Sequence, residues 1–177
     1  IRLFVCTARS PRLEVSLGWS EREFSLFDGG IYCNGTCIMR ENGCEYVFMP
    51  RDIAEFCIKK TEEYEDLHIA LSLESETHAF NHDVPEKAWK FWNVCDENVL
   101  KIESADLERI PKLLMYYDNM MDSEKLLPDD LFCEIHKYCG GRASAYHIDG
   151  GRTIQVTAAD KVWGIERVRC ELGLTKD

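Results

Sequence analysis

The stretch TCIMRENGCEYVFM, residues 36–49, decides the fold class of this chain. Two runs rich in apolar and aromatic residues are separated in it by Glu41-Asn42-Gly43. Asn-Gly suits the tight type I′ turn, whose two central residues need a positive φ, and it is the strongest short signal for a hairpin. The stretch therefore predicts two antiparallel strands, at 36–40 and 44–49.

A second hairpin is predicted around Asp149-Gly150-Gly151, with strands at 143–148 and 152–157. Two hairpins imply antiparallel pairing, and the expected elements do not alternate regularly between strand and helix. We therefore expect an α+β fold, an antiparallel sheet built from hairpins and packed with about four to five helices. The length of 177 residues favours a single α+β domain, residues 1–177, with a possible lobe boundary near 118–129.

The period of the apolar residues predicts the other elements. Alternation with period two predicts strands at 13–19, 24–26 and 67–73, and a short strand is expected at 99–102. Helices are expected at 50–65, from Pro85 onward, at 105–120 with a kink at Pro111, at 128–138, and from a Thr157 cap to Gly173. The polar segment 75–84 is expected to be a loop.

Charge bounds the classes of partner. The chain has 21 Lys and Arg against 32 Asp and Glu, a net charge of −11. Direct nucleic-acid binding is therefore not expected, because it needs a basic surface. A protein partner with a basic surface is favoured instead, although acidity also serves solubility alone. No apolar run is long enough to cross a membrane, so no membrane association is expected.

Nine cysteines are the most unusual feature of the composition. Several lie in apolar segments, where a free thiol behaves as a small hydrophobe, so an intracellular, cytoplasmic protein is favoured. A secreted protein remains the alternative, with a disulfide between Cys37 and Cys44. Whether residues precede Ile1, and the oligomeric state, do not follow from the sequence.

One group of residues has the types and spacing of a zinc site. Cys133, His136 and Cys139 recur every three residues along a predicted helix, and neighbours three apart share a helix face. His147 on the adjacent hairpin is the candidate fourth ligand, which makes zinc the possible cofactor. The alternative is a helix in which Cys133 lines the core and His136 faces solvent.

A cluster of aromatic residues suggests a binding surface. Trp89, Phe91 and Trp92 cannot all face one core from a single helix, and Tyr116-Tyr117 lie near the expected lobe boundary. Aromatic residues are enriched at binding hot spots, so these five are the candidate partner-binding residues. Packing in a core is the alternative.

These observations favour a non-enzymatic interaction protein. The sharpest version is an acidic inhibitor, antagonist or adaptor of a basic, possibly nucleic-acid-binding, protein. The alternatives are a zinc-binding protein with a structural or hydrolytic site, and an enzyme with a thiol nucleophile. No nucleophile elbow, phosphate-binding loop or dinucleotide motif is present, so no catalytic residue is assigned.

Overall fold

The structure is a computed structural model that describes residues 1–74, 77–92, 94–117 and 125–175. Its contacts divide the chain into two compact units. Unit 1 combines Ile1–Val47 with Ala159–Asp177, and unit 2 is Phe48–Ala158. The predicted lobe boundary at 118–129 falls largely outside the described residues, so it stays a prediction, as does the single domain.

Unit 1 has a sheet with the strand order β1-β2-β3-β4 within the described residues. Its strands are β1 (Phe4–Cys6), β2 (Gly29–Tyr32), β3 (Cys37–Arg40) and β4 (Gly43–Tyr46). β1 and β2 run parallel, and the other neighbours are antiparallel. The β3–β4 pairing confirms the hairpin predicted around Asn42-Gly43. The pair Arg40–Gly43 places Glu41 and Asn42 in the turn, and Gly43, with a φ of 115°, is the first residue of β4.

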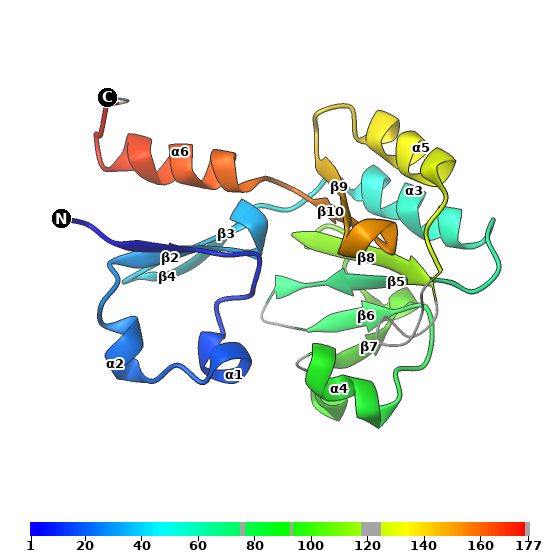
Figure 1. The fold of residues 1–177 in the computed structure, drawn as a ribbon, viewed down its shortest axis with the longest axis horizontal. Coiled ribbons are helices and arrows are strands. Elements are labelled where there is room, and N and C mark those ends of the chain that lie inside the picture. Colours follow the sequence, from blue (N-terminus) through cyan, green and yellow to red (C-terminus); the bar gives the residue numbers. More distant parts are fainter. Residues whose placement is uncertain (75–76, 93, 118–124, 176–177) are drawn as a thin grey trace. The chain divides into compact units, whose positions relative to one another are not determined.

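Helices lie on both faces of this sheet (Figure 1). They are α1 (Leu13–Leu17), α2 (Glu21–Phe24) and α6 (Lys161–Glu171). Leu13, Tyr32 and Cys37 form the core on the α1 and α2 side, while Ile31, Ile38 and Val168 form the core under α6. Unit 1 is thus a layered structure with two small cores.

Unit 2 has a sheet with the strand order β7-β6-β5-β8-β10-β9 within the described residues. Its strands are β5 (Leu67–Ser72), β6 (His78–Phe80), β7 (Val99–Lys101), β8 (Lys112–Tyr117), β9 (Ser144–Ile148) and β10 (Thr153–Thr157). Only the β6–β7 pair is parallel among these neighbours. The β9–β10 pair confirms the second predicted hairpin.

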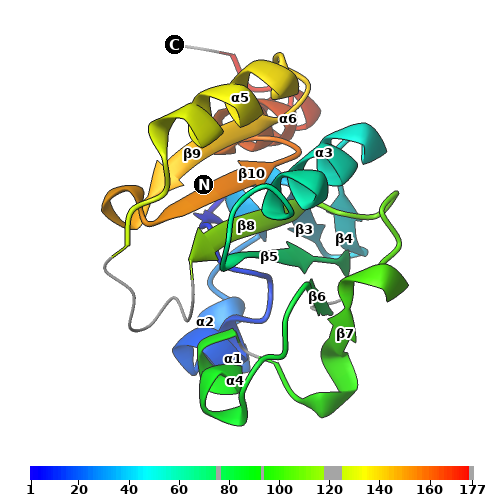
Figure 2. The same ribbon diagram turned by 90° about the vertical axis from the view of Figure 1, so that its right-hand side faces the viewer.

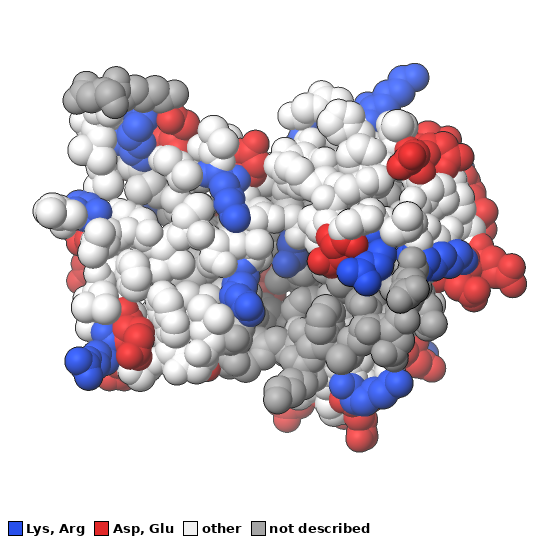
Figure 3. Space-filling model, in the orientation of Figure 1, with Lys and Arg blue, Asp and Glu red and all other residues white. Residues whose placement is uncertain are grey.

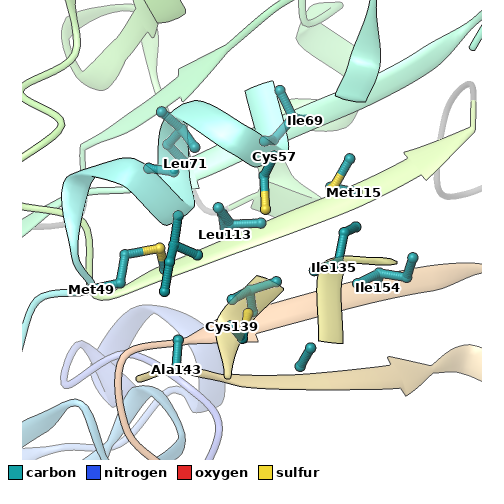
Figure 4. Close-up of a cluster of buried hydrophobic side chains, with 14 of the residues drawn as sticks. Met49, Cys57, Ile69, Leu71, Leu113, Met115, Ile135, Cys139, Ala143 and Ile154 are labelled. Carbon is teal, nitrogen blue, oxygen red and sulfur yellow. The ribbon is translucent and has the colours of Figure 1, made fainter. Parts of the chain in front are cut away.

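Figure 2 shows α3 (Arg51–Thr61) and α5 (Asp129–Cys139) over one face of this sheet. Alternate residues of the central strands, such as Ile69 and Met115, point at these helices and are fully buried. The close-up in Figure 4 shows them meeting Cys57 from α3 and Ile135 from α5. The short helix α4 (Glu86–Trp92) belongs to the other side, where Trp92 packs against Phe80 and Tyr116.

The α+β fold class is confirmed, because both sheets are mixed and antiparallel pairs dominate them. Several local predictions are wrong. Residues 13–19 were expected as a strand, but Leu13–Leu17 form helix α1. Residues 24–26 were expected as a strand, but Phe24 ends helix α2 and Ser25 is its C-cap. Part of the expected loop 75–84 is β6, and part of the expected helix 105–120 is β8. The last helix is capped by Asp160, whose carboxylate accepts the Trp163 N–H, and not by Thr157.

Candidate functional site

The parallel strands β1 and β2 bring two loops to one edge of the unit 1 sheet. Parallel strands end at the same edge, and ligands of open α/β sheets bind there. Here the loops are held together by main-chain hydrogen bonds. The Asn34 N–H donates to the Thr7 carbonyl oxygen at 3.2 Å, and the Cys33 N–H donates to that of Arg9 at 2.8 Å. The Thr7 hydroxyl oxygen also accepts the Arg9 N–H at 3.1 Å.

The turn after β2 has an unusual backbone. Cys33 and Asn34 are consecutive non-glycine residues with φ of 51° and 58°. Non-glycine residues rarely adopt positive φ, and such strained positions concentrate at functional sites. The turn reverses the chain tightly between β2 and β3 and places the Asn34 main chain beside Thr7.

The N-terminus of α6 meets the same edge. A Cβ on Gly35 would lie 1.9 Å from the Asp160 carbonyl oxygen, so only glycine lets the turn and the helix approach this closely. Gly164, one turn into α6, packs in the same way against Ile31 and Gly35. Two glycines therefore bring the helix start onto the loop that follows β2.

This edge carries two cationic residues, Arg9 and Lys161, in an acidic chain. The N-terminus of a helix carries partial positive charge and free N–H groups. Lys161, the first residue of α6, and Arg9 are exposed, and neither forms an ion pair with any residue that the structure describes. Arg142 and Arg167 are neutralised by contrast, because Arg142 binds Asp52 and Arg167 binds Glu45 and Glu171. The edge therefore suits an anion.

Unit 2 contains a cavity of about 680 Å³ between α3 and the segment after β7. Glu62, Glu103 and Asp106 line it, and they form no ion pair within the described residues. The Arg51 guanidinium, also in the lining, is already bound by Glu55 at 2.7 Å. The cavity is consequently unfavourable for an anion, and the unit 1 edge is the better candidate for one.

The predicted zinc ligands do not converge. Cys133 and His136 are exposed on α5, whereas Cys139 is buried in the unit 2 core. His147 packs on the ring of Phe132 at 4.1 Å. Within the described residues, no group of three His, Cys, Asp or Glu side chains could hold a metal ion, so zinc gains no support.

Three of the buried cysteines, Cys37, Cys57 and Cys139, lack the features of a nucleophile. All nine cysteines are free thiols, and Cys33, Cys37, Cys57 and Cys139 are buried. Burial raises the pKa of Cys37, Cys57 and Cys139 above the ordinary value for a thiol. A raised pKa keeps a thiol protonated and unreactive, which opposes a thiol enzyme built on these three residues.

The predicted partner-binding aromatics are mostly packed inside unit 2. Tyr116 and Tyr117 are buried, and Trp92 contacts Tyr116 with ring centroids 5.5 Å apart. Trp89 is half-buried and donates its indole N–H to the Val84 carbonyl oxygen. The side chain of Phe91 lies outside the described part of the chain. These contacts are the ones expected if the aromatic residues pack in a core, the alternative to a partner-binding surface.

No protein-family model matches this sequence, and no curated protein matches it. Solved structures do. The chain superposes on a sugar phosphatase of HAD subclass IIB with a TM-score of 0.64 and 17% identity, over 99% of this chain and 64% of that one. A HAD phosphatase from Bacteroides thetaiotaomicron superposes with a TM-score of 0.66 and 18% identity, over 99% of this chain and 61% of that one. A haloacid dehalogenase-like hydrolase from B. subtilis superposes with a TM-score of 0.60 and 10% identity, over 99% of this chain and 68% of that one.

The chain has a Rossmann-like fold of the HAD type. It spans about two thirds of the length of the structures that it matches. The prediction of a non-enzymatic inhibitor, antagonist or adaptor is wrong, because the similar structures are phosphatases and hydrolases. Among the described residues, no helix has the length and apolar character needed to cross a membrane.

Proposed function

We propose that unit 1 binds the phosphoryl group of a phosphomonoester at the carboxyl ends of β1 and β2, and that the whole protein hydrolyses this ester. The observation that carries the proposal is the meeting of two strand ends and the α6 N-terminus through Gly35 and Asp160. The loop after β1 carries Arg9 and the helix begins with Lys161, and neither forms an ion pair within the described residues. The likeness to phosphatases supports phosphate as the anion.

Each residue of the edge has a role in binding. The first main-chain N–H groups of α6, at Lys161 and Val162, have no partner within the helix and are suited to phosphate oxygens. The Lys161 ammonium and the Arg9 guanidinium neutralise negative charge on the phosphoryl group. This neutralisation matters most as the bond to the leaving oxygen breaks, because negative charge then develops. The Thr7 hydroxyl accepts the Arg9 N–H, so its own proton is free to donate to the ligand.

The described edge supplies binding groups and no attacking group. Asp160 is the carboxylate at the start of α6, and it accepts the Trp163 N–H at 2.7 Å as the helix cap. Phosphoryl transfer commonly uses Mg²⁺, which needs oxygen ligands, chiefly carboxylates. One engaged carboxylate does not make a magnesium site, so we derive no step through a metal.

Hydrolysis of p-nitrophenyl phosphate by the whole protein tests the proposal. Lys161→Ala should lower kcat/KM by roughly 100-fold, because removing one preorganised group that stabilises developing charge has about this effect. Lys161→Arg should restore part of the loss. The matched control is Arg152→Ala in unit 2, since Arg152 is also exposed and forms no ion pair within the described residues. It should leave the rate unchanged.

Binding gives a second readout that does not depend on turnover. Orthovanadate should perturb the amide signals of Thr7, Asn34 and Lys161 and leave those of the unit 2 cavity unchanged. Perturbation at the cavity alone, or no hydrolysis together with no vanadate binding, would refute the proposed site. All nine thiols are free, which supports a reducing, cytoplasmic setting for this activity.

A further inference from the structure

Asp160 joins the turn after β2 to the first turn of α6. Its carboxylate accepts the Trp163 N–H at 2.7 Å, and its carbonyl oxygen accepts the Gly164 N–H at 3.1 Å. The same carbonyl group packs on Gly35, where an added Cβ would lie 1.9 Å from the oxygen and 3.1 Å from the Lys161 nitrogen. The peptide group between Asp160 and Lys161 is therefore held from both sides.

The bond from Asp160 divides the first N–H groups of α6. An α-helix leaves these groups without partners inside the helix. Asp160, with the extended backbone of a helix cap (φ −116°, ψ 172°), takes the N–H of Trp163. The N–H groups of Lys161 and Val162 form no hydrogen bond with any residue that the structure describes. The cap therefore determines which two N–H groups stay available to an anion.

The same cap places a negative charge at a site for anions. Ser and Asn cap helices about as well as Asp and carry no charge. A helix rises about 5 Å per turn, so the Asp160 carboxylate lies on the order of 5 Å from an anion on the Lys161 and Val162 N–H groups. Like charges at that distance repel enough to weaken binding severalfold. Asp160 therefore opposes the anion that the rest of the edge attracts.

Little else offsets the charge of this carboxylate. Asp160 forms no ion pair within the described part of the chain. Figure 3, in the orientation of Figure 1, shows a broad uncharged area over unit 1 with isolated Lys and Arg side chains on it. Where few charges surround a site, one carboxylate supplies a large part of the local field.

We propose that Asp160 is a positioning residue of the phosphate site and that its charge limits how tightly the site holds a phosphate dianion. As the cap, it orders the first turn of α6 so that the Lys161 and Val162 N–H groups are presented to the ligand. As a carboxylate, it weakens the binding of inorganic phosphate, the product of ester hydrolysis, and so favours its release. This inference rests on the proposed phosphatase function.

Two substitutions in the whole protein separate these roles. Asp160→Asn keeps an oxygen that can accept the Trp163 N–H and removes the charge. It should lower the inhibition constant of inorganic phosphate roughly 5-fold and lower KM for p-nitrophenyl phosphate in parallel, and kcat should not rise. Asp160→Ala removes the cap as well. It should lower kcat/KM roughly 10-fold and speed amide exchange in the first turn of α6.

Asp28→Asn is the matched control. Asp28 also accepts a main-chain N–H, that of Leu3 at 2.8 Å, but it directly precedes β2 and so lies at the opposite end of that strand from the site. Its replacement removes the same charge from unit 1 and should leave phosphate inhibition unchanged.

An unchanged or raised inhibition constant in Asp160→Asn would overturn the proposal, and so would identical kinetics of Asp160→Asn and Asp160→Ala. Both results presuppose a parent protein that hydrolyses the ester and is inhibited by phosphate. A parent protein that does neither would refute the phosphatase function itself, and the role of Asp160 with it.

Discussion

The two units cover their sheets differently. In unit 2, α3 and α5 enclose one core that includes twenty buried residues. In unit 1, the two cores have four and three buried members. Of the twelve large apolar residues that are exposed in the described part of the chain, nine belong to unit 1, although it is the smaller unit. Among the described residues, unit 2 therefore buries a larger share of its apolar side chains than unit 1 does.

This difference indicates which interactions stabilise each unit. Burying apolar surface is the dominant favourable contribution to folding, and a small unit buries a smaller fraction of its surface. Unit 2 therefore has the material to fold as an independent unit. Unit 1 depends on close backbone contacts and on ion pairs. Each prediction below removes one support of unit 1 or of unit 2.

The largest effect is expected from Gly35→Ala in unit 1. The added methyl would overlap the Asp160 carbonyl oxygen, and the φ of +101° is itself unfavourable for alanine. The two penalties together should destabilise unit 1 by about 4 kcal/mol. Hydrogen exchange followed by mass spectrometry should show faster exchange in β1–β4 and α6 while α3 and α5 stay protected.

Gly18→Ala is the control for this prediction. Gly18 also has a positive φ, +69°, but nothing lies within 4 Å of an added Cβ. It should cost only about 1 kcal/mol. If the two substitutions destabilise unit 1 equally, the contact between Gly35 and Asp160 does not hold α6 on the sheet.

The converse substitution, Leu131→Ala, tests the unit 2 core. Leu131 is fully buried on α5, within the cluster that also contains Ile69 and Ile154. Leaving a cavity there should destabilise unit 2 by about 3 kcal/mol. In this variant, unit 2 should unfold at a lower urea concentration than in the parent protein. Unit 1 should unfold at the same urea concentration as unit 2 or at a lower one. Unit 1 outlasting unit 2 would contradict the ranking of the two units.

The hairpins were predictable because their signal is local. Asn42-Gly43 and Gly150-Gly151 indicate a chain reversal from neighbouring residues alone, although the first turn is centred one residue earlier, on Glu41-Asn42. The helices α3 and α5 each span eleven residues, enough for the apolar period to emerge. The errors lie where that period is too short or absent. α1 and α2 have five and four residues, and β8 is a central strand whose run Lys112–Tyr117 is apolar on both faces.

The candidate site was not predictable in the same way. Thr7, Asn34 and Lys161 lie far apart in the sequence and meet only through the pairing of β1 with β2 and the return of α6. No sequence motif with a fixed spacing connects these three residues. One local signal was available: Asn34-Gly35 sits between two strand-like runs, as an anion-binding turn after a strand does. The zinc prediction failed because sequence spacing did not show that Cys139 faces the core while Cys133 faces solvent.

A smaller effect is expected from Arg167→Ala in unit 1. Arg40, Glu45, Arg167 and Glu171 form a closed ring of ion pairs that joins α6 to the β3–β4 hairpin. All four side chains are partly exposed, so breaking the ring should cost at most about 1 kcal/mol. The loss of stability should be smaller in 1 M salt, because the electrostatic screening length there is roughly 3 Å. Arg22→Ala, at an arginine without an ion pair in the described chain, should show neither the loss nor the salt dependence.

The smallest effect is expected from Asp52→Asn, which tests the surface of unit 2. Both carboxylate oxygens of Asp52 accept hydrogen bonds from Arg142, at 2.8 and 2.9 Å, and these bonds lower the pKa of Asp52 below its ordinary value. The folded state thus binds this proton more weakly than the unfolded state. The pair therefore stabilises unit 2 above the ordinary carboxyl pKa of about 3.9, and its contribution is lost as the pH falls through the lowered value.

Asp52→Asn should accordingly be slightly less stable than the parent protein at neutral pH and equal to it in strong acid. Urea midpoints of unit 2 measured from neutral pH down to about pH 2 would show the two curves converging. Asp129→Asn is the matched control, because Asp129 also lies in the first turn of a helix but forms no ion pair within the described residues. Parallel curves for Asp52→Asn and its parent would mean that solvent already screens this pair. This ion pair would then add nothing to the stability of unit 2, unlike the ring of ion pairs expected to stabilise unit 1.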